Sequence, residues 1–155
     1  MDKEIKGKMI QVCQNLTRML EFAFEGFRRP TAASFREVEE FEDKIYETSS
    51  ELTGFIISKT PTAEKEKEQI KPYLSIASSL GILTYNIQST LDRVRGKFEN
   101  HIVFSDQADK EVNDLFQETT GLLGNLPDLF VSESKSLAQK VGEQGRSMFK
   151  IADGY

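Results

Sequence analysis

The spacing of apolar residues limits the possible folds of this chain more than any other feature of its sequence. Between residues 5 and 27 apolar side chains recur at steps of three and four, and the same spacing returns in segments 35–55, 73–98, 112–126 and 137–151. This period is typical of amphipathic α-helices, whereas no segment sustains the alternation that predicts a strand. The sequence therefore predicts an all-α protein.

Turn signals separate about five predicted helices. The first ends before "RRPT", and the second ends near "SKTPT", where Pro61 suits the first turn of a following helix. The third opens in the charged run "AEKEKEQIK" and contains Pro72, the fourth is capped by Ser105 or Asp106, and the fifth restarts at "SESK". Short connections place consecutive helices antiparallel, so we expect an elongated antiparallel helical bundle.

One stretch of the third segment carries no charge at all. Residues 72–91, "PYLSIASSLGILTYNIQSTL", lack any charged side chain in a chain whose residues are 29% charged. The stretch is long enough to span a bilayer, but about half of its residues are polar, and a bilayer would leave those groups without hydrogen-bond partners. We therefore expect the central helix of a water-soluble bundle, surrounded by other helices.

Composition narrows the class of protein further. A chain of 155 residues forms one ordinary domain, and its net charge of -5 would repel the phosphate backbone of nucleic acids. Cys13 is the only cysteine, so an internal disulfide and a thiolate metal cage are excluded, and a packing role is expected. The N-terminus lacks the apolar region of a secretory signal, which favours a cytoplasmic location.

Catalytic motifs are missing from the sequence. Its single histidine, His101, falls at an expected helix end and is interpreted as a loop residue or a partner of the helix dipole. No P-loop, nucleophile elbow, glycine-rich dinucleotide turn or HExxH pattern occurs. We therefore expect no enzyme activity.

Carboxylates in the second segment are the remaining candidates for chemistry. Glu39 and Asp43 share one helical face, and a metal site in a bundle needs such acids on facing helices. The facing third helix has no acid between residues 72 and 91, so the cluster is interpreted as a solvated acidic surface. Its members in "REVEEFEDKIYE" are Glu37, Glu39, Glu40, Glu42, Asp43 and Glu47.

The order of segments resembles the PhoU family. The resemblance is strongest to the PhoU-like domains of sodium/phosphate cotransporters and their small standalone relatives. The segments that carry it are "EFAFEGF", "FREVEEFEDKIYETSSEL", "YLSIASSLGILTYNIQSTLDRV" and "KFENHIVFSDQADKEVNDLF". The resemblance implies tandem three-helix repeats within one domain, 1–155, with a first repeat at about 1–100 and a partial second at about 104–155. An offset of 103 residues, which lays Phe27 on Phe130 and Leu20 on Leu123, is a weak internal match of this kind.

The family's metal-binding signatures are degraded here. The acidic signature of the second helix falls on Glu42 and Tyr46, with tyrosine in place of aspartate. The acidic run of the third helix falls on "SLGILTY", so that Ser79, Gly81 and Tyr85 occupy acidic positions. These neutral side chains do not supply the charged oxygen ligands that hard cations need, so no cofactor is expected and iron or zinc is disfavoured. We expect packing to replace metal chemistry, with Tyr46 against Tyr85.

Three hypotheses follow. The first is a non-catalytic PhoU-like protein of phosphate transport or its regulation, located in the cytoplasm or at the inner face of the membrane. Its acidic surface (Glu37, Glu39, Glu40 and Glu47) would contact a transporter or a sensor kinase. The second is a metal-carboxylate bundle that binds iron or zinc through Glu39, Glu42 or Asp43 and acids elsewhere. The third is a dimerising bundle, because a missing last helix of the second repeat would leave a groove open.

Overall fold

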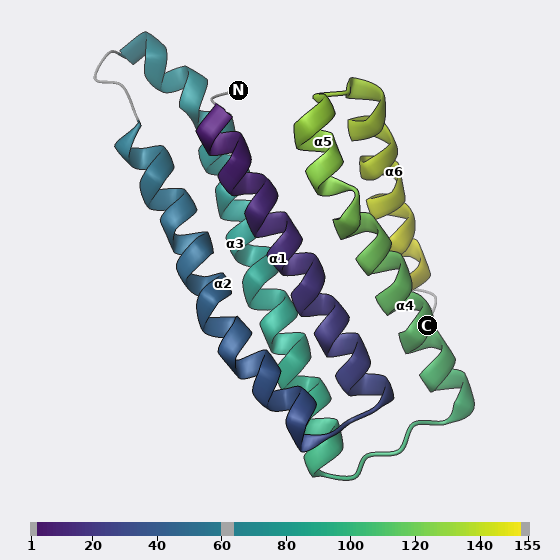
Figure 1. Ribbon diagram of the computed structural model, residues 1–155. Coiled ribbons are helices and arrows are strands. Elements are labelled where there is room, and N and C mark those ends of the chain that lie inside the picture. The colour runs from purple at the N-terminus through teal and green to yellow at the C-terminus, as the bar shows by residue number, and fades with distance from the viewer. Residues whose placement is uncertain (1–2, 60–63, 153–155) are drawn as a thin grey trace.

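The computed structural model describes residues 3–59 and 64–152, without the side chains of 32–34, 37, 39, 40, 64–67 and 69. Its helices are α1 (Lys3–Arg28), α2 (Ala32–Ser58), α3 (Glu64–Glu99), α4 (Asp106–Gly124), α5 (Leu126–Ser132) and α6 (Lys135–Ala152). No strand occurs in the described part of the chain. The predicted all-α bundle is confirmed, and the fourth predicted segment is divided into α4 and α5 (Figure 1).

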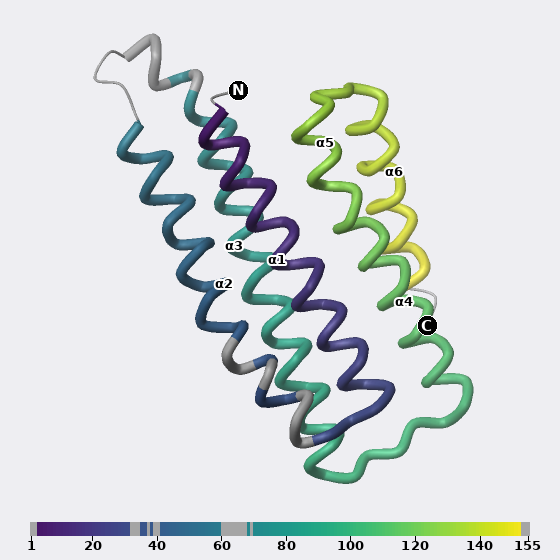
Figure 2. Tube along the Cα trace, viewed as in Figure 1, coloured from purple at the N-terminus to yellow at the C-terminus, as the bar shows by residue number. Residues whose placement is uncertain are grey.

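The helices run up and down the long axis of the molecule. α1, α2 and α3 pack against one another as an antiparallel unit, and α4 and α5 pack on another side of α1 (Figures 1 and 2). α6 lies beside α4 and α5 and contacts no other helix along the described residues. α1 is therefore the central helix. The prediction that the uncharged helix α3 would be surrounded is wrong, because among the described residues α3 packs only against α1 and α2.

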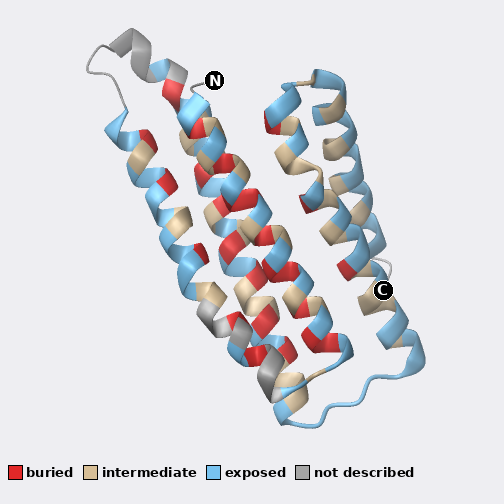
Figure 3. Ribbon diagram, viewed as in Figure 1, coloured by how far each residue is buried: buried red, intermediate tan, exposed pale blue. Residues whose placement is uncertain are grey.

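α1 occupies the centre because its apolar residues cover most of its circumference. Its buried positions occur along the whole helix, whereas α6 contains no buried residue (Figure 3). At the edges of α1, long cationic side chains cover aromatic rings: the Arg18 guanidinium lies over Phe22 and Phe41. The buried residues of α1 are Ile5, Met9, Val12, Cys13, Leu16, Met19, Leu20, Ala23, Gly26 and Phe27.

The helix ends follow local sequence signals. Ser105 caps α4, with its hydroxyl accepting a hydrogen bond from the backbone N–H of Ala108 at 3.2 Å, as one of the two predicted caps. Pro127 lies in the first turn of α5, where its missing N–H costs no helical hydrogen bond. α3 continues through Pro72, and the chain leaves it at His101, which has a left-handed φ of 52°.

The helix boundaries follow the 103-residue offset found in the sequence. It carries the start of α1 at Lys3 to the start of α4 at Asp106, and the start of α2 at Ala32 to the start of α6 at Lys135. The broken pair α4 and α5 thus corresponds to the continuous helix α1. Leu20 and Phe27, like their counterparts Leu123 and Phe130, are buried. Among residues 3–59 and 64–152, no helix is both long and apolar enough to cross a membrane.

Candidate interaction surface

The uncharged stretch of α3 has one buried and one exposed side. Ala77, Leu80, Thr84, Ile87 and Leu91 are buried against α1 and α2. The opposite side presents side chains that are small, polar or apolar, but none that is charged. Ile82 is 60% exposed and Tyr85 is 66% exposed. The exposed members of this uncharged face are Ser75, Ser78, Ser79, Ile82, Tyr85 and Asn86.

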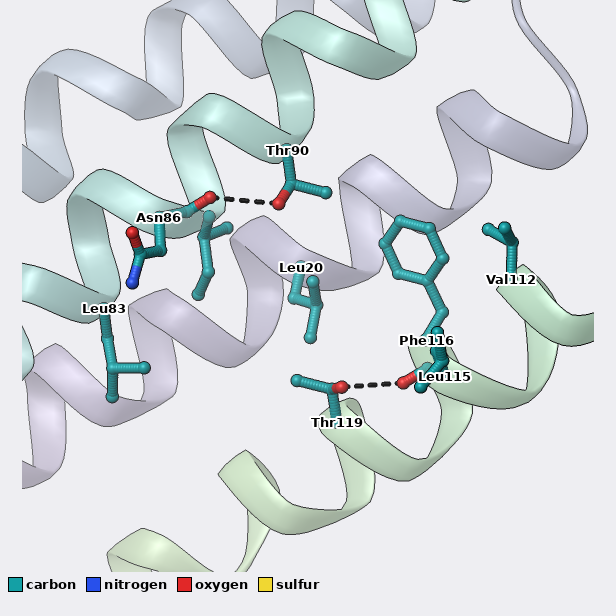
Figure 4. A pocket seen from close by; sticks show the side chains of 9 residues that line it. Leu20, Leu83, Asn86, Thr90, Val112, Leu115, Phe116 and Thr119 are labelled. Carbon is teal, nitrogen blue, oxygen red and sulfur yellow. Dashed lines mark hydrogen bonds between the residues drawn. The ribbon is translucent and has the colours of Figure 1, made fainter. Parts of the chain in front are cut away.

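A groove of about 330 Å³ lies beside this face, between α3 and α4. The two helices do not pack directly against each other along their described residues, and Leu20 of α1 forms the floor between them (Figure 4). Its walls come from two distant parts of the sequence. The α3 wall consists of Leu83, Asn86, Ile87 and Thr90, and the α4 wall of Val112, Leu115, Phe116 and Thr119.

The two hydroxyl groups that line the groove donate hydrogen bonds within their own helices. The hydroxyl of Thr90 donates to the backbone carbonyl of Asn86 at 3.0 Å, and the hydroxyl of Thr119 donates to that of Leu115 at 2.7 Å (Figure 4). Neither hydroxyl needs a hydrogen bond from an occupant of the groove, and no charged residue lines it. The groove therefore suits an apolar occupant better than an ionic one.

The acidic residues of α2 do not form a metal centre in the described structure. Asp43 and Glu47 are exposed, and Glu42 is half-buried. The side chains of Glu37, Glu39 and Glu40 lie outside the described ones, so the predicted sharing of a face by Glu39 and Asp43 is untested. Within the described side chains, no three of His, Cys, Asp or Glu gather as metal ligands would. The expectation of no iron or zinc stays a prediction.

The degraded motif positions lie on the open side of the α2–α3 pair. The hydroxyl of Tyr46 donates to the side-chain carbonyl of Gln88. Ser79 is exposed and bonds only within its helix, and a Cβ added at Gly81 would meet no atom within 4 Å. No ring contact joins Tyr85 to Tyr46 in the part of the chain that the structure describes. The expected packing of Tyr46 against Tyr85 is therefore wrong, and the two side chains are 44% and 66% exposed.

Neither Cys13 nor His101 adds a reactive centre. Cys13 is fully buried in α1, and burial raises the pKa of its thiol to about 12, which keeps it protonated and unreactive. His101 is exposed in the connection between α3 and α4. The packing role predicted for Cys13 and the loop position predicted for His101 agree with these placements. The absence of enzyme activity stays a prediction.

Sequence reasoning missed the α4 wall of the groove, although a signal for it was present. The offset of 103 residues maps Val12 and Leu16, which are buried in the core, onto Leu115 and Thr119, which are half-buried in the groove. A position that is buried in one repeat and open in the other marks a missing neighbour. Comparison with known proteins gives no guide here, because no family model, curated protein or solved structure significantly matches the chain.

Proposed function

We propose that this chain is a PhoU-like helical bundle that acts without catalysis, in phosphate transport or its regulation, by binding a protein partner. The observation that carries the proposal is the agreement between the 103-residue offset and the helix boundaries. A three-helix unit followed by the first two helices of a second unit is the organisation that the resemblance implies.

The acidic side of α2 is the contact surface in this proposal. Asp43 and Glu47 are exposed one helical turn apart, on a protein with a net charge of -5. Exposed carboxylates on a rigid helix attract basic segments over about 10 Å at moderate salt. The cytoplasmic loops of a phosphate transporter, or basic segments of a sensor kinase, are partners of suitable charge.

A binding experiment with matched charge changes tests the proposal. Basic loop peptides from the phosphate transporter and sensor kinase of the same genome are titrated against wild-type protein and the double variant Asp43→Lys/Glu47→Lys. The control is Asp114→Lys/Glu118→Lys, which makes the same change of charge at exposed residues of α4. The α2 variant is expected to bind roughly tenfold more weakly than the control.

Two results would count against this function. Equal weakening by both double variants would mean that net charge, and not the α2 surface, governs binding. No binding of any loop, together with unchanged phosphate uptake in a deletion strain, would remove the link to phosphate transport altogether.

A further inference from the structure

The uncharged face of α3 and the groove beside it lie on the same side of the molecule. Ile82 forms a ridge on the exposed side of α3, and Asn86, one helical turn later, is both exposed on that side and part of the groove wall. Residues four positions apart lie on the same face of a helix, so the ridge at Ile82 borders the groove. A surface with a ridge next to a groove is self-complementary when it meets a second copy turned by half a revolution.

Electrostatics make this face better suited to self-association than most other surfaces of the protein. In a protein with a net charge of -5, two copies that met through patches of mainly negative charge would repel each other. α3 carries no charge from 72 to 91, and no charged residue lines the groove. The α3 part of this face therefore allows close approach of two identical chains without desolvating an ion.

The internal repeat indicates that a neighbouring helix is missing beside the groove. In the first unit α3 packs against both α1 and α2, whereas in residues 104–152 the helix beside α4 and α6 is the short α5, which together with α4 corresponds to α1. Tyr46 of α2 bonds to Gln88 of α3, whereas its counterpart at the 103-residue offset, Phe149 of α6, is 77% exposed. The half-buried wall residues and exposed Phe149 are what the absence of such a helix would leave.

We propose that two copies of the chain associate about a twofold axis, with the α3 ridge of each copy packed into the groove between α3 and α4 of the other. The uncharged stretch is about 30 Å long, and a surface two helices wide gives roughly 600 Å² from each copy. The total of about 1,200 Å² lies at the lower end of stable protein interfaces. The inference does not rest on the proposed function, because it uses neither the acidic side of α2 nor any phosphate-related partner.

The oligomeric state and its response to one charge test this dimer. Sedimentation equilibrium from about 1 to 100 µM is expected to show a monomer–dimer equilibrium. Ile82→Lys places a charge on the ridge and is expected to raise the dissociation constant at least roughly tenfold. The matched control is Val103→Lys, because Val103 is 90% exposed in the connection after α3, outside the proposed face, and its change is expected to stay within about threefold.

Cross-linking locates the interface independently. Ser78→Cys puts a thiol on the uncharged face, and Ser132→Cys puts one on exposed α5, while buried Cys13 does not react. A flexible bismaleimide is expected to join two copies of the first variant and not of the second. A wild-type protein that remains monomeric at 100 µM, equal weakening by both lysine variants, or cross-linking through Ser132→Cys alone would overturn the proposal. Circular dichroism of each variant confirms that its helices are intact.

Discussion

A cavity at the centre of α1 should destabilise this protein far more than the same deletion in α6. Leu16 is fully buried in the helix that contacts α2, α3, α4 and α5, whereas Leu137 is half-buried in α6, which contacts only α4 and α5. Leu→Ala removes the same three carbon atoms at both positions. The difference in the free energy of unfolding therefore reports the packing around each site.

The magnitudes follow from burial. A fully buried Leu→Ala change loses transfer free energy and leaves a cavity, so Leu16→Ala should cost roughly 3–5 kcal/mol. At Leu137 about half of the removed surface is already in water and the site is open, so about 1 kcal/mol is expected. For a chain of this size, the larger loss would lower the melting temperature by roughly 10 °C.

Urea unfolding followed by far-UV circular dichroism measures both values, at one protein concentration so that any association affects all variants alike. An unchanged dependence of the free energy on urea shows that the native and unfolded states remain comparable. If Leu137→Ala costs as much as Leu16→Ala, or if Leu16→Ala costs less than about 1.5 kcal/mol, α1 is not the central helix of this bundle.

Four further results are expected. Thiol reagents at pH 8 should modify Cys13 only as fast as the protein unfolds, because burial raises its pKa to about 12; rapid labelling under native conditions would contradict its burial. The hydrogen bond and ion pair from Lys6, at 3.2 Å, lower the pKa of Glu133. Any contribution of this pair to stability is therefore present above the pKa of the carboxyl in the unfolded chain. It is lost as the pH falls through the lower pKa of the folded state. In Lys6→Ala the pKa of Glu133 should rise toward its ordinary range in an NMR titration, and an unchanged value would show that the contact does not form. Gly54→Ala should stabilise by about 0.5–1 kcal/mol in urea unfolding, since the added Cβ meets no atom within 4 Å, and a loss of stability would mean that a neighbour lies closer. Protein purified without chelator should contain less than stoichiometric iron, zinc and manganese by elemental analysis, whereas one metal ion per chain would favour the metal-carboxylate hypothesis.

Several features of the candidate surface could be predicted from the sequence, but its exposure could not. The uncharged stretch, which includes Ser79, Gly81 and Tyr85, is visible in the sequence. Serine, threonine, glycine and tyrosine occur both in cores and on surfaces, so their presence does not reveal whether a further helix covers them. The same ambiguity led to the prediction that α3 is the central helix. The tertiary contacts resolve it, because among the described residues α3 contacts α1 and α2 and no other helix.

The sequence by itself determined the helices and most of their limits, because helical periodicity, caps and proline act over a few residues. Ser105 at the start of α4 and the buried positions of α1 follow from such local rules. Only the tertiary structure decided which helix is surrounded. An apolar stripe indicates which face of a helix avoids water, but not how many neighbouring helices cover it. That number depends on contacts between distant residues, such as Lys6 with Glu133 and Phe24 with Phe116. For the same reason α6, as amphipathic as the other helices in its sequence, has no fully buried residue in the folded chain.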